Sequence, residues 1–306
     1  MEIKARAAVL ASFAADSLAL GAHWIYNTHV IDKKLGRVER YVKPFVSYHA
    51  TKELGEFTHY GDQMLVLLET VADSGKFDLN GFGAKWQAFF KDYTGYIDKA
   101  TQGTLDNFAA NEDPSQSGSE SDDLAGASRI SPLVYCYQDK PEQMIASVRA
   151  QTAVTHNQAD VIDSAEFFAR VTMAILDGQT PCEALKAVLK ANFNRPPFIE
   201  QVNDGIDSAS DDSRETRSAI ADFGQMCEIK AAFPATIHLI AKYESNLKEA
   251  LVENVMAGGD SASRGMIVGM VLGAYLGMEA LPDEWLTEMK QHPFITKLLN
   301  KIESSR

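Results

Sequence analysis

Cysteine is scarce in this sequence of 306 residues. Only three occur, at the widely spaced positions Cys136, Cys182 and Cys227. An odd number of separated cysteines gives no support to a disulfide framework or to a zinc site built from close cysteine pairs. We therefore expect a protein of the reducing cytoplasm.

Long hydrophobic runs are also missing. The apolar stretch over residues 265–278 is shorter than the roughly 20 residues that a helix needs to cross a bilayer. A second apolar stretch near the start of the sequence superficially resembles a signal peptide, but Asp16 interrupts it and aromatic residues follow. We interpret this stretch as an amphipathic helix and expect no membrane segment.

An excess of basic residues is absent as well. Lys and Arg number 29 against 42 Asp and Glu, which gives a formal net charge of −13. Nucleic acids and anionic membranes both favour basic protein surfaces. We therefore expect neither as a partner. The hydrophobic fraction of 45% is ample for a globular core.

Runs of alternating Val, Ile and Thr are nearly absent, so no sheet is predicted. Apolar residues instead recur at three- and four-residue spacing, which predicts helices. The predicted helices cover residues 3–20, 64–72, 82–96, 144–154, 159–176, 181–193, 231–243, 247–255 and 263–278. We expect an all-α fold.

Three breaks interrupt these helices, at residues 32–58, 101–124 and 192–213. The second break is polar and could be a linker between domains. Long polar loops in helical proteins more often overhang a site, so we expect a single domain over residues 1–306.

Four glycines, Gly265, Gly269, Gly273 and Gly277, recur on one face of the predicted helix 263–278. Each glycine lowers helix stability by about 1 kcal/mol relative to alanine. A compensating gain is expected where a flat glycine stripe lets a second helix approach closely. We expect this helix to lie at the centre of the molecule.

Two short loops each place an aspartate before an apolar helix. Asp62 lies in the loop 56–63, and Asp260 lies in the loop 258–264. Each carboxylate, taken alone, is interpreted as a helix cap. If the loops converge, the two carboxylates and the Ser263 hydroxyl form an oxygen-rich site suited to magnesium.

Two histidines are further candidates. His23 follows Asp16 by two helical turns, so both side chains could share one helix face. His156 follows Thr155 and precedes a helix. For each histidine, a hydrogen-bonded core residue is the alternative to a functional role.

Several motifs, in this order along the chain, resemble those of the ADP-ribosylglycohydrolase family, and most closely the branch that includes the J-type crystallins. They are Ala15-Asp16 with residues 23–27, Tyr60-Gly61-Asp62-Gln63, the stretch 126–133, Thr155-His156, and the stretch 258–263. The resemblance implies a compact multi-helix orthogonal bundle, a cleft for ADP-ribose and a two-magnesium centre. Metal-assisted hydrolysis of a glycosidic bond is the implied reaction.

The sequence departs from the family pattern at the implied metal centre. Gly61 and Ala262 stand where the family has aspartates, and His23 stands where it has a glutamate. Two divalent cations would bring four positive charges against the two negative charges of Asp62 and Asp260. We therefore expect one magnesium, held by these aspartates and Ser263, or none.

We expect Asp62, Asp260 and His23 to be the catalytic residues. A cation, either the Arg264 guanidinium or the His23 imidazolium, is expected to take over part of the metal's role by pairing with the two aspartates. The resemblance further implies ligand binding by Gly126, Ala127, Ser128 and His156, with backbone amides of the first three facing a phosphate or ribose. Arg129 could contact a phosphate or form a structural ion pair.

Two functions follow from these patterns. The first is a hydrolase that cleaves an N- or O-glycosidic bond to ADP-ribose or a related nucleotide glycoside, with a degenerate metal centre. The second is an inactive ADP-ribose-binding or structural, crystallin-like protein. The expected partner is an ADP-ribosylated protein or a small ADP-ribose-like ligand. The sequence makes no prediction of oligomeric state.

Overall fold

The computed structural model describes residues 2–110 and 113–305. Within these ranges the ordered elements are helices, and strand pairing is limited to two isolated bridges. The all-α prediction is confirmed. Residues 111 and 112 of the predicted break 101–124 lie outside the described residues.

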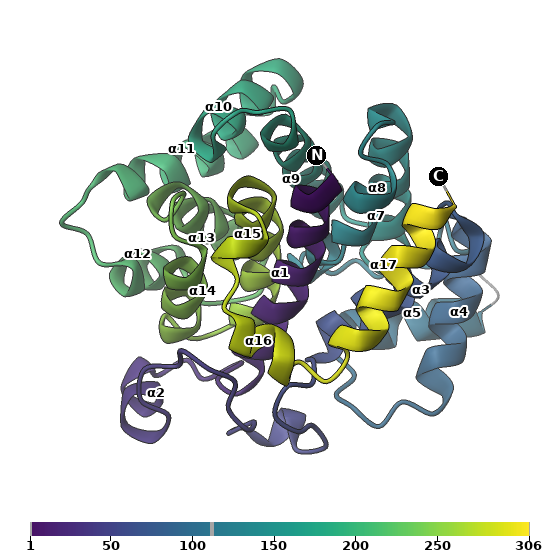
Figure 1. Ribbon diagram of the computed structural model, residues 1–306, viewed down its shortest axis with the longest axis horizontal. Coiled ribbons are helices and arrows are strands. Elements are labelled where there is room, and N and C mark those ends of the chain that lie inside the picture. Colours follow the sequence, from purple (N-terminus) through teal and green to yellow (C-terminus); the bar gives the residue numbers. More distant parts are fainter. Residues whose placement is uncertain (1, 111–112, 306) are drawn as a thin grey trace.

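The helices follow one another along the whole described chain (Figure 1). They are α1 (Glu2–Leu20), α2 (Thr28–Lys34), η1 (Ser47–His49), α3 (His59–Ser74), α4 (Leu79–Lys91), α5 (Lys99–Ala109), α6 (Ala125–Ser128), α7 (Ser131–Cys136), α8 (Pro141–Thr155), α9 (Ala159–Leu176), α10 (Pro181–Asn192), α11 (Pro196–Ser210), α12 (Thr216–Phe223), α13 (Ile229–Lys242), α14 (Leu247–Met256), α15 (Ser261–Leu276), η2 (Met278–Ala280), α16 (Asp283–Glu288) and α17 (His292–Ser304).

The glycine-striped helix α15 is buried along almost its whole length, as predicted. An added Cβ at Gly269 would lie 2.5 Å from the Ala11 carbonyl oxygen, and one at Gly273 would lie 2.8 Å from that of Ala7. Later residues of α15 thus pack against earlier residues of α1, so the two helices run antiparallel. Two of the four glycines make this close approach possible.

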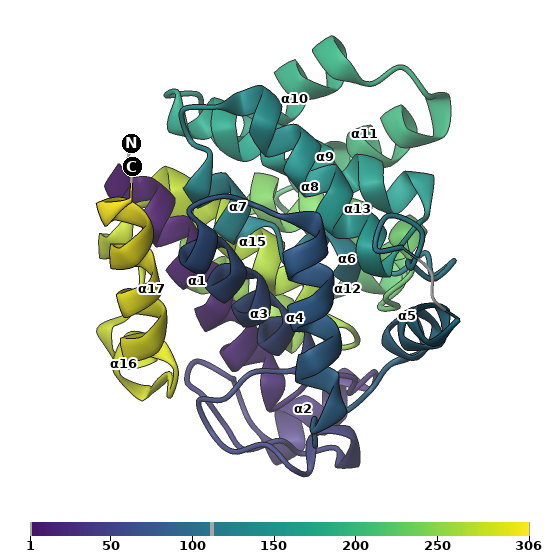
Figure 2. The ribbon, with the colours of Figure 1, turned by 90° about the vertical axis from the view of Figure 1, so that its right-hand side faces the viewer.

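The pair α1 and α15 occupies the middle of the molecule (Figure 1). Helices α10 to α14 lie on one side, and α3, α4, α5 and α17 lie on the other. In Figure 2, α2 and the irregular segment that follows it lie at the bottom of the molecule. The ends of the described chain are close, and Arg6 of α1 forms an ion pair of 2.9 Å with Glu303 of α17.

Several predicted boundaries are wrong. The helix predicted over residues 64–72 begins at His59, so Asp62 lies inside α3, and the cap is Thr58 rather than Asp62. The predicted break 192–213 contains α11, because Pro196 and Pro197 begin a helix rather than a turn. The predicted break 101–124 contains most of α5. The helix predicted over residues 82–96 ends at Lys91, which leaves residues 92–98 as an irregular segment. Both tyrosines of that segment, Tyr93 and Tyr96, then lie outside any helix.

Among residues 2–110 and 113–305, no helix is both long enough and apolar enough to cross a bilayer.

Candidate functional site

A short segment, residues 225–227, joins the loops that build the candidate site. On one side, Leu124 N donates to Cys227 O at 2.9 Å, and the next bond of the same bridge runs from Ile229 N to Asp122 O at 2.8 Å. On the other side, Asp260 N donates to Gln225 O at 2.9 Å. These backbone bonds bring together three stretches that are far apart in the sequence.

The loop before α15 is held close to the end of α1. Gly259 has φ +66°, and an added Cβ there would overlap the Gln225 carbonyl oxygen. Gly259 N donates to Ile25 O, and Trp24 N donates to Gly259 O, each at 2.9 Å. Only glycine combines this left-handed backbone with so close a contact.

The joined loops gather Asp123, Cys227 and Asp260. Their ligand atoms all lie within 4.8 Å of one another. Burial raises the pKa of all three groups, and the Asp260 charge further raises the pKa of Asp123 and of the Cys227 thiol. Two carboxylates this close favour a shared proton or a bound cation.

A cavity of about 550 Å³ opens above this cluster. Aromatic side chains supply much of its wall, and Asp123 and Cys227 are part of its lining. The lining residues are Trp24, Tyr26, Tyr48, Tyr96, Asp98, Lys99, Ala100, Ser121, Asp122, Asp123, Met226, Cys227 and Glu228. Lys99 is the one cationic residue among these described lining residues.

Trp24 has an unusual backbone. Its φ of +66° is the one positive value among the described residues other than glycine. A bulky residue in this region is strained and persists only when its surroundings hold it there. Its ring contacts His49 in a stacked geometry at 5.6 Å and meets Tyr48 and Tyr96 edge-on. These contacts therefore hold the strained Trp24 in place, with its ring at the cavity wall.

Three buried histidines lie beside the cluster. His23 Nε2 is 3.2 Å from Asp260 Oδ1, but neither ring nitrogen of His23 forms a hydrogen bond with a described residue. Burial lowers the pKa of His23 well below its usual value, and nearby His49 and His59 lower it further. His23 is thus neutral at physiological pH and does not supply the expected cation.

His59 begins α3 and forms a pair with Asp98, which caps α5. His59 Nε2 lies 3.0 Å from Asp98 Oδ2, and Asp98 accepts a 2.6 Å bond from Thr101 N. Burial raises the pKa of Asp98, but the His59 and Thr101 contacts outweigh it and leave the pKa below its usual value. Asp98 is therefore a carboxylate at the cavity wall.

Asp62 does not join the cluster of Asp123, Cys227 and Asp260. Its Oδ2 pairs with Lys52 Nζ and accepts a 2.6 Å hydrogen bond from the Tyr93 hydroxyl. Burial raises the pKa of Asp62, and Lys52 opposes this shift. The cation that neutralises Asp62 is thus Lys52, not Arg264 or His23.

Arg264 and Ser263 lie beside Asp260 in the first turn of α15, and both are fully buried. Arg264 donates to Asn254 Oδ1 at 3.1 Å and to Gly258 O at 2.6 Å. Burial lowers its pKa to about 10, and the Asp260 charge opposes this shift. The Ser263 backbone N–H donates to Asp260 Oδ1 at 3.4 Å and lowers the pKa of Asp260, whereas the Ser263 hydroxyl has no hydrogen bond to a described residue.

Comparison with known proteins identifies the fold and its lineage. The sequence profile described as ADP-ribosylglycohydrolase matches residues 2–306. The chain belongs to the ADP-ribosylglycohydrolase family. A solved chain described as an ADP-ribosylglycohydrolase-related protein complex superposes with a TM-score of 0.80 at 20% identity, covering 99% of this chain and 98% of that one.

Two curated relatives are similar at low identity. Crystallin J1A of Tripedalia cystophora is 23% identical over 93% of this chain and 91% of its own length. The ADP-ribosylarginine hydrolase Tri1 of Pseudomonas putida strain GB-1 is 22% identical over 81% of this chain and 66% of its own length. The chain is therefore similar both to a protein named as an enzyme and to a protein named as a crystallin.

The four residues expected to bind the ligand lie together but away from the cavity lining. Gly126 N and Ala127 N donate within their own turn, to Asp123 O and Leu124 O. The Ser128 hydroxyl donates to Ala125 O at 2.8 Å. An added Cβ at Gly126 would lie 2.8 Å from the His156 ring, so α6 packs closely on His156. These contacts give α6 a packing role.

Arg129 makes structural contacts, but with neutral side chains rather than through the ion pair considered for it. Its guanidinium is buried and donates to Gln63 Oε1 and Thr155 Oγ1. Thr155 Oγ1 in turn lies 2.9 Å from His156 Nδ1. Arg129 therefore connects α3 to the end of α8 rather than facing the cavity.

Sequence reasoning missed Asp123, Cys227 and Lys52. Asp123 ends a polar stretch whose composition indicates only a loop, and Cys227 is one of three isolated cysteines. The one local signal for Asp123 is its place just before the Gly126 motif. Nothing in the sequence pairs it with Cys227, because the pairing arises from a bridge between remote segments.

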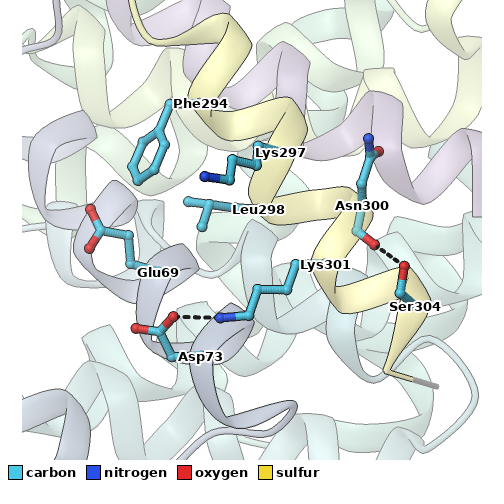
Figure 3. Close-up of a pocket in the computed structure, with 8 residues that line it drawn as sticks. All are labelled: Glu69, Asp73, Phe294, Lys297, Leu298, Asn300, Lys301 and Ser304. Atoms are coloured by element: carbon cyan, nitrogen blue, oxygen red, sulfur yellow. Dashed lines mark hydrogen bonds and ion pairs between the residues drawn. The ribbon is translucent and has the colours of Figure 1, made fainter.

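A second hollow of about 490 Å³ lies between α3 and α17 (Figure 3). Lys301 Nζ forms a 2.8 Å ion pair with Asp73 there, and the Ser304 hydroxyl donates to Asn300 O. Asp73 and Glu69 also pair with Lys85, which lies outside the hollow, so both of its carboxylates are already neutralised at the surface. We therefore place the candidate site at the Asp123 cavity.

Proposed function

We propose that this protein hydrolyses an N- or O-glycosidic bond between ADP-ribose, or a related nucleotide, and an acceptor on a protein or small molecule. The buried pair Asp123 and Asp260 beneath the aromatic-walled cavity carries this proposal. Family membership supports the substrate class.

The carboxylate pair is suited to accept a proton from water. Burial raises the pKa of both groups, which makes them stronger bases than exposed carboxylates. A water at the pair would lose a proton to it as the water oxygen attacks the anomeric carbon. The pair would then pass this proton to the departing acceptor, and the hydroxyl of the water would remain on the anomeric carbon.

The cavity wall is suited to bind the nucleotide part. Trp24, Tyr48 and Tyr96 offer aromatic surfaces on which a base can stack. Lys99, the first residue of α5, would meet the negative diphosphate. Asp98 and Asp122 are available to accept hydrogen bonds from ribose hydroxyls.

The residues present do not fit the two-magnesium centre that the family resemblance implies. An added side chain at Gly61 would overlap the Asp16 carboxylate, so no aspartate can be accommodated there without rearrangement. Asp62 is already neutralised by Lys52, and Ala262 offers no ligand. The single magnesium expected between Asp62, Asp260 and Ser263 does not fit either, because Asp62 is paired with Lys52. No step above depends on magnesium.

Hydrolysis of an ADP-ribosylated peptide by the purified chain tests the proposal. We expect Asp260→Asn and Asp123→Asn each to lower kcat by about 100-fold or more, the usual size of a lost proton-transfer group. Asp106→Asn, on the exposed face of α5, is the matched control and should leave kcat unchanged. Unchanged turnover in both site variants would refute the assignment.

A binding or structural role is the second candidate, and the lost carboxylates at Gly61 and Ala262 favour it. Under this alternative, ADP-ribose binds to the cavity without turnover, or does not bind at all. Calorimetric titration with ADP-ribose separates these two outcomes. If ADP-ribose binds to the cavity without turnover, Trp24→Ala should weaken that binding.

A further inference from the structure

We propose that Asp123, Cys227 and Asp260 hold one zinc ion at the floor of the cavity. This inference deepens the proposed function. Only the catalytic role of a metal-bound water rests on that function. The binding of the ion itself is independent of any catalytic activity.

The donor set favours zinc over magnesium. Magnesium prefers oxygen ligands in octahedral geometry, whereas a thiolate with carboxylates suits zinc. The three ligand atoms lie within 4.8 Å of one another. Zinc bonds of about 2.0 to 2.3 Å would require these atoms to move closer by only about 1 Å, within reach of side-chain rotation.

Two further side chains point to a ligand at this place. His23 is fully buried and its Nε2 lies 3.2 Å from Asp260, yet neither ring nitrogen forms a hydrogen bond with a described residue. The Ser263 hydroxyl, also fully buried beside Asp260, is likewise without such a bond. Buried polar atoms are rarely left without partners, and an ion with its water would supply them.

The local charges balance around such an ion. Two carboxylates and a thiolate bring three negative charges against the two positive charges of zinc. The fully buried Arg264 guanidinium, whose charge acts on Asp260, supplies the remaining positive charge. As the zinc–sulfur bond forms, the Cys227 thiol releases its proton to solvent.

The fourth position of a tetrahedral site would face the cavity. Asp123 and Cys227 line the cavity, while Asp260 has no exposed surface. Three protein ligands and an open position are typical of catalytic zinc sites, where the bound water is activated. With the ion bound, the metal would activate the attacking water, and Asp123 and Asp260 would act as its ligands rather than as proton acceptors.

Cobalt titration of the metal-depleted full-length chain tests the site. We expect one Co²⁺ per chain, with the intense visible bands of tetrahedral coordination and a near-ultraviolet thiolate-to-cobalt band. Zinc should displace the cobalt stoichiometrically, and millimolar magnesium should not. In Cys227→Ser, the thiolate band should vanish and zinc affinity should fall at least tenfold.

Cys182→Ser is the matched control, because Cys182 is also half-buried but lies on α10. It should keep the cobalt spectrum unchanged. A spectrum that survives Cys227→Ser, or an absence of stoichiometric zinc binding, would overturn the zinc site. Hydrolysis without zinc would leave the proposed function intact, whereas zinc binding without hydrolysis would remove the function and keep the site.

Discussion

The Asp16 carboxylate restricts which residue can occupy position 61. The fully buried Asp16 carboxylate accepts hydrogen bonds from Thr58 N at 2.7 Å and Thr58 Oγ1 at 2.6 Å. Thr58 is itself the cap of α3. A side chain at Gly61 would overlap this carboxylate. Asp16 is therefore a structural partner of α3.

The protonation of Asp16 links stability to pH. Burial raises its pKa to about 7, against the partial opposition of Thr58. Because the folded pKa lies above the unfolded value of about 3.9, the stabilising contribution is present at low pH and is lost as the pH rises through about 7.

We expect wild-type protein to lose up to about 4 kcal/mol of unfolding free energy relative to Asp16→Asn between about pH 4 and pH 7. The asparagine cannot ionise, so the same loss is absent from the variant. Urea unfolding of both proteins across this pH range measures the difference. Parallel pH profiles would show that Asp16 does not titrate in this range.

The elements that sequence periodicity predicted best are those with long apolar faces. Helix α9 begins and ends where predicted, and α15 is central as its glycines indicated. Helix α5 was missed because its sequence is largely polar, and α11 because its leading prolines were interpreted as a turn. Local pattern therefore predicts buried helices better than half-exposed ones.

The close approach of α1 and α15 makes Gly269 sensitive to substitution. An added methyl group would lie 2.5 Å from the Ala11 carbonyl oxygen. We expect Gly269→Ala to lower the unfolding free energy by about 1 to 3 kcal/mol, because overpacking outweighs the gain in helix propensity.

Gly103→Ala in α5 is the control, since its added Cβ meets a single side-chain atom at 3.2 Å. Helix propensity should then leave its stability within about 1 kcal/mol of wild type. Urea unfolding compares the two variants. Equal stability losses would mean that α15 is not packed as closely as described.

For the whole molecule, the sequence predicted the fold class and one member of the candidate ligand cluster, Asp260, with its neighbour His23. The remaining members, Asp123 and Cys227, could not be predicted, because no spacing rule connects residues joined by backbone bonds across remote loops. Asp62 was placed with Asp260 by analogy with the family. In the structure Asp62 pairs with Lys52 instead, so it does not act together with Asp260 as the family pattern suggests.

The net charge of −13 has a consequence for the binding of an anionic ligand. Long-range repulsion between the protein and ADP-ribose weakens as salt screens it. We expect ADP-ribose affinity to rise about two- to threefold between roughly 20 mM and 150 mM salt. Calorimetry measures it, with uncharged adenosine as the control. A fall in affinity with salt would indicate a basic binding surface instead.

The joining of residues 24–25, 122–124, 225–227 and 257–260 also bears on how the protein folds. Contacts between segments far apart in sequence form against a large loop-closure entropy, and so tend to form late. Individual helices can be present before these loops meet, but the cavity floor cannot. Competence to bind a ligand would therefore report that both halves of the chain have docked, a property that helical content alone does not reveal.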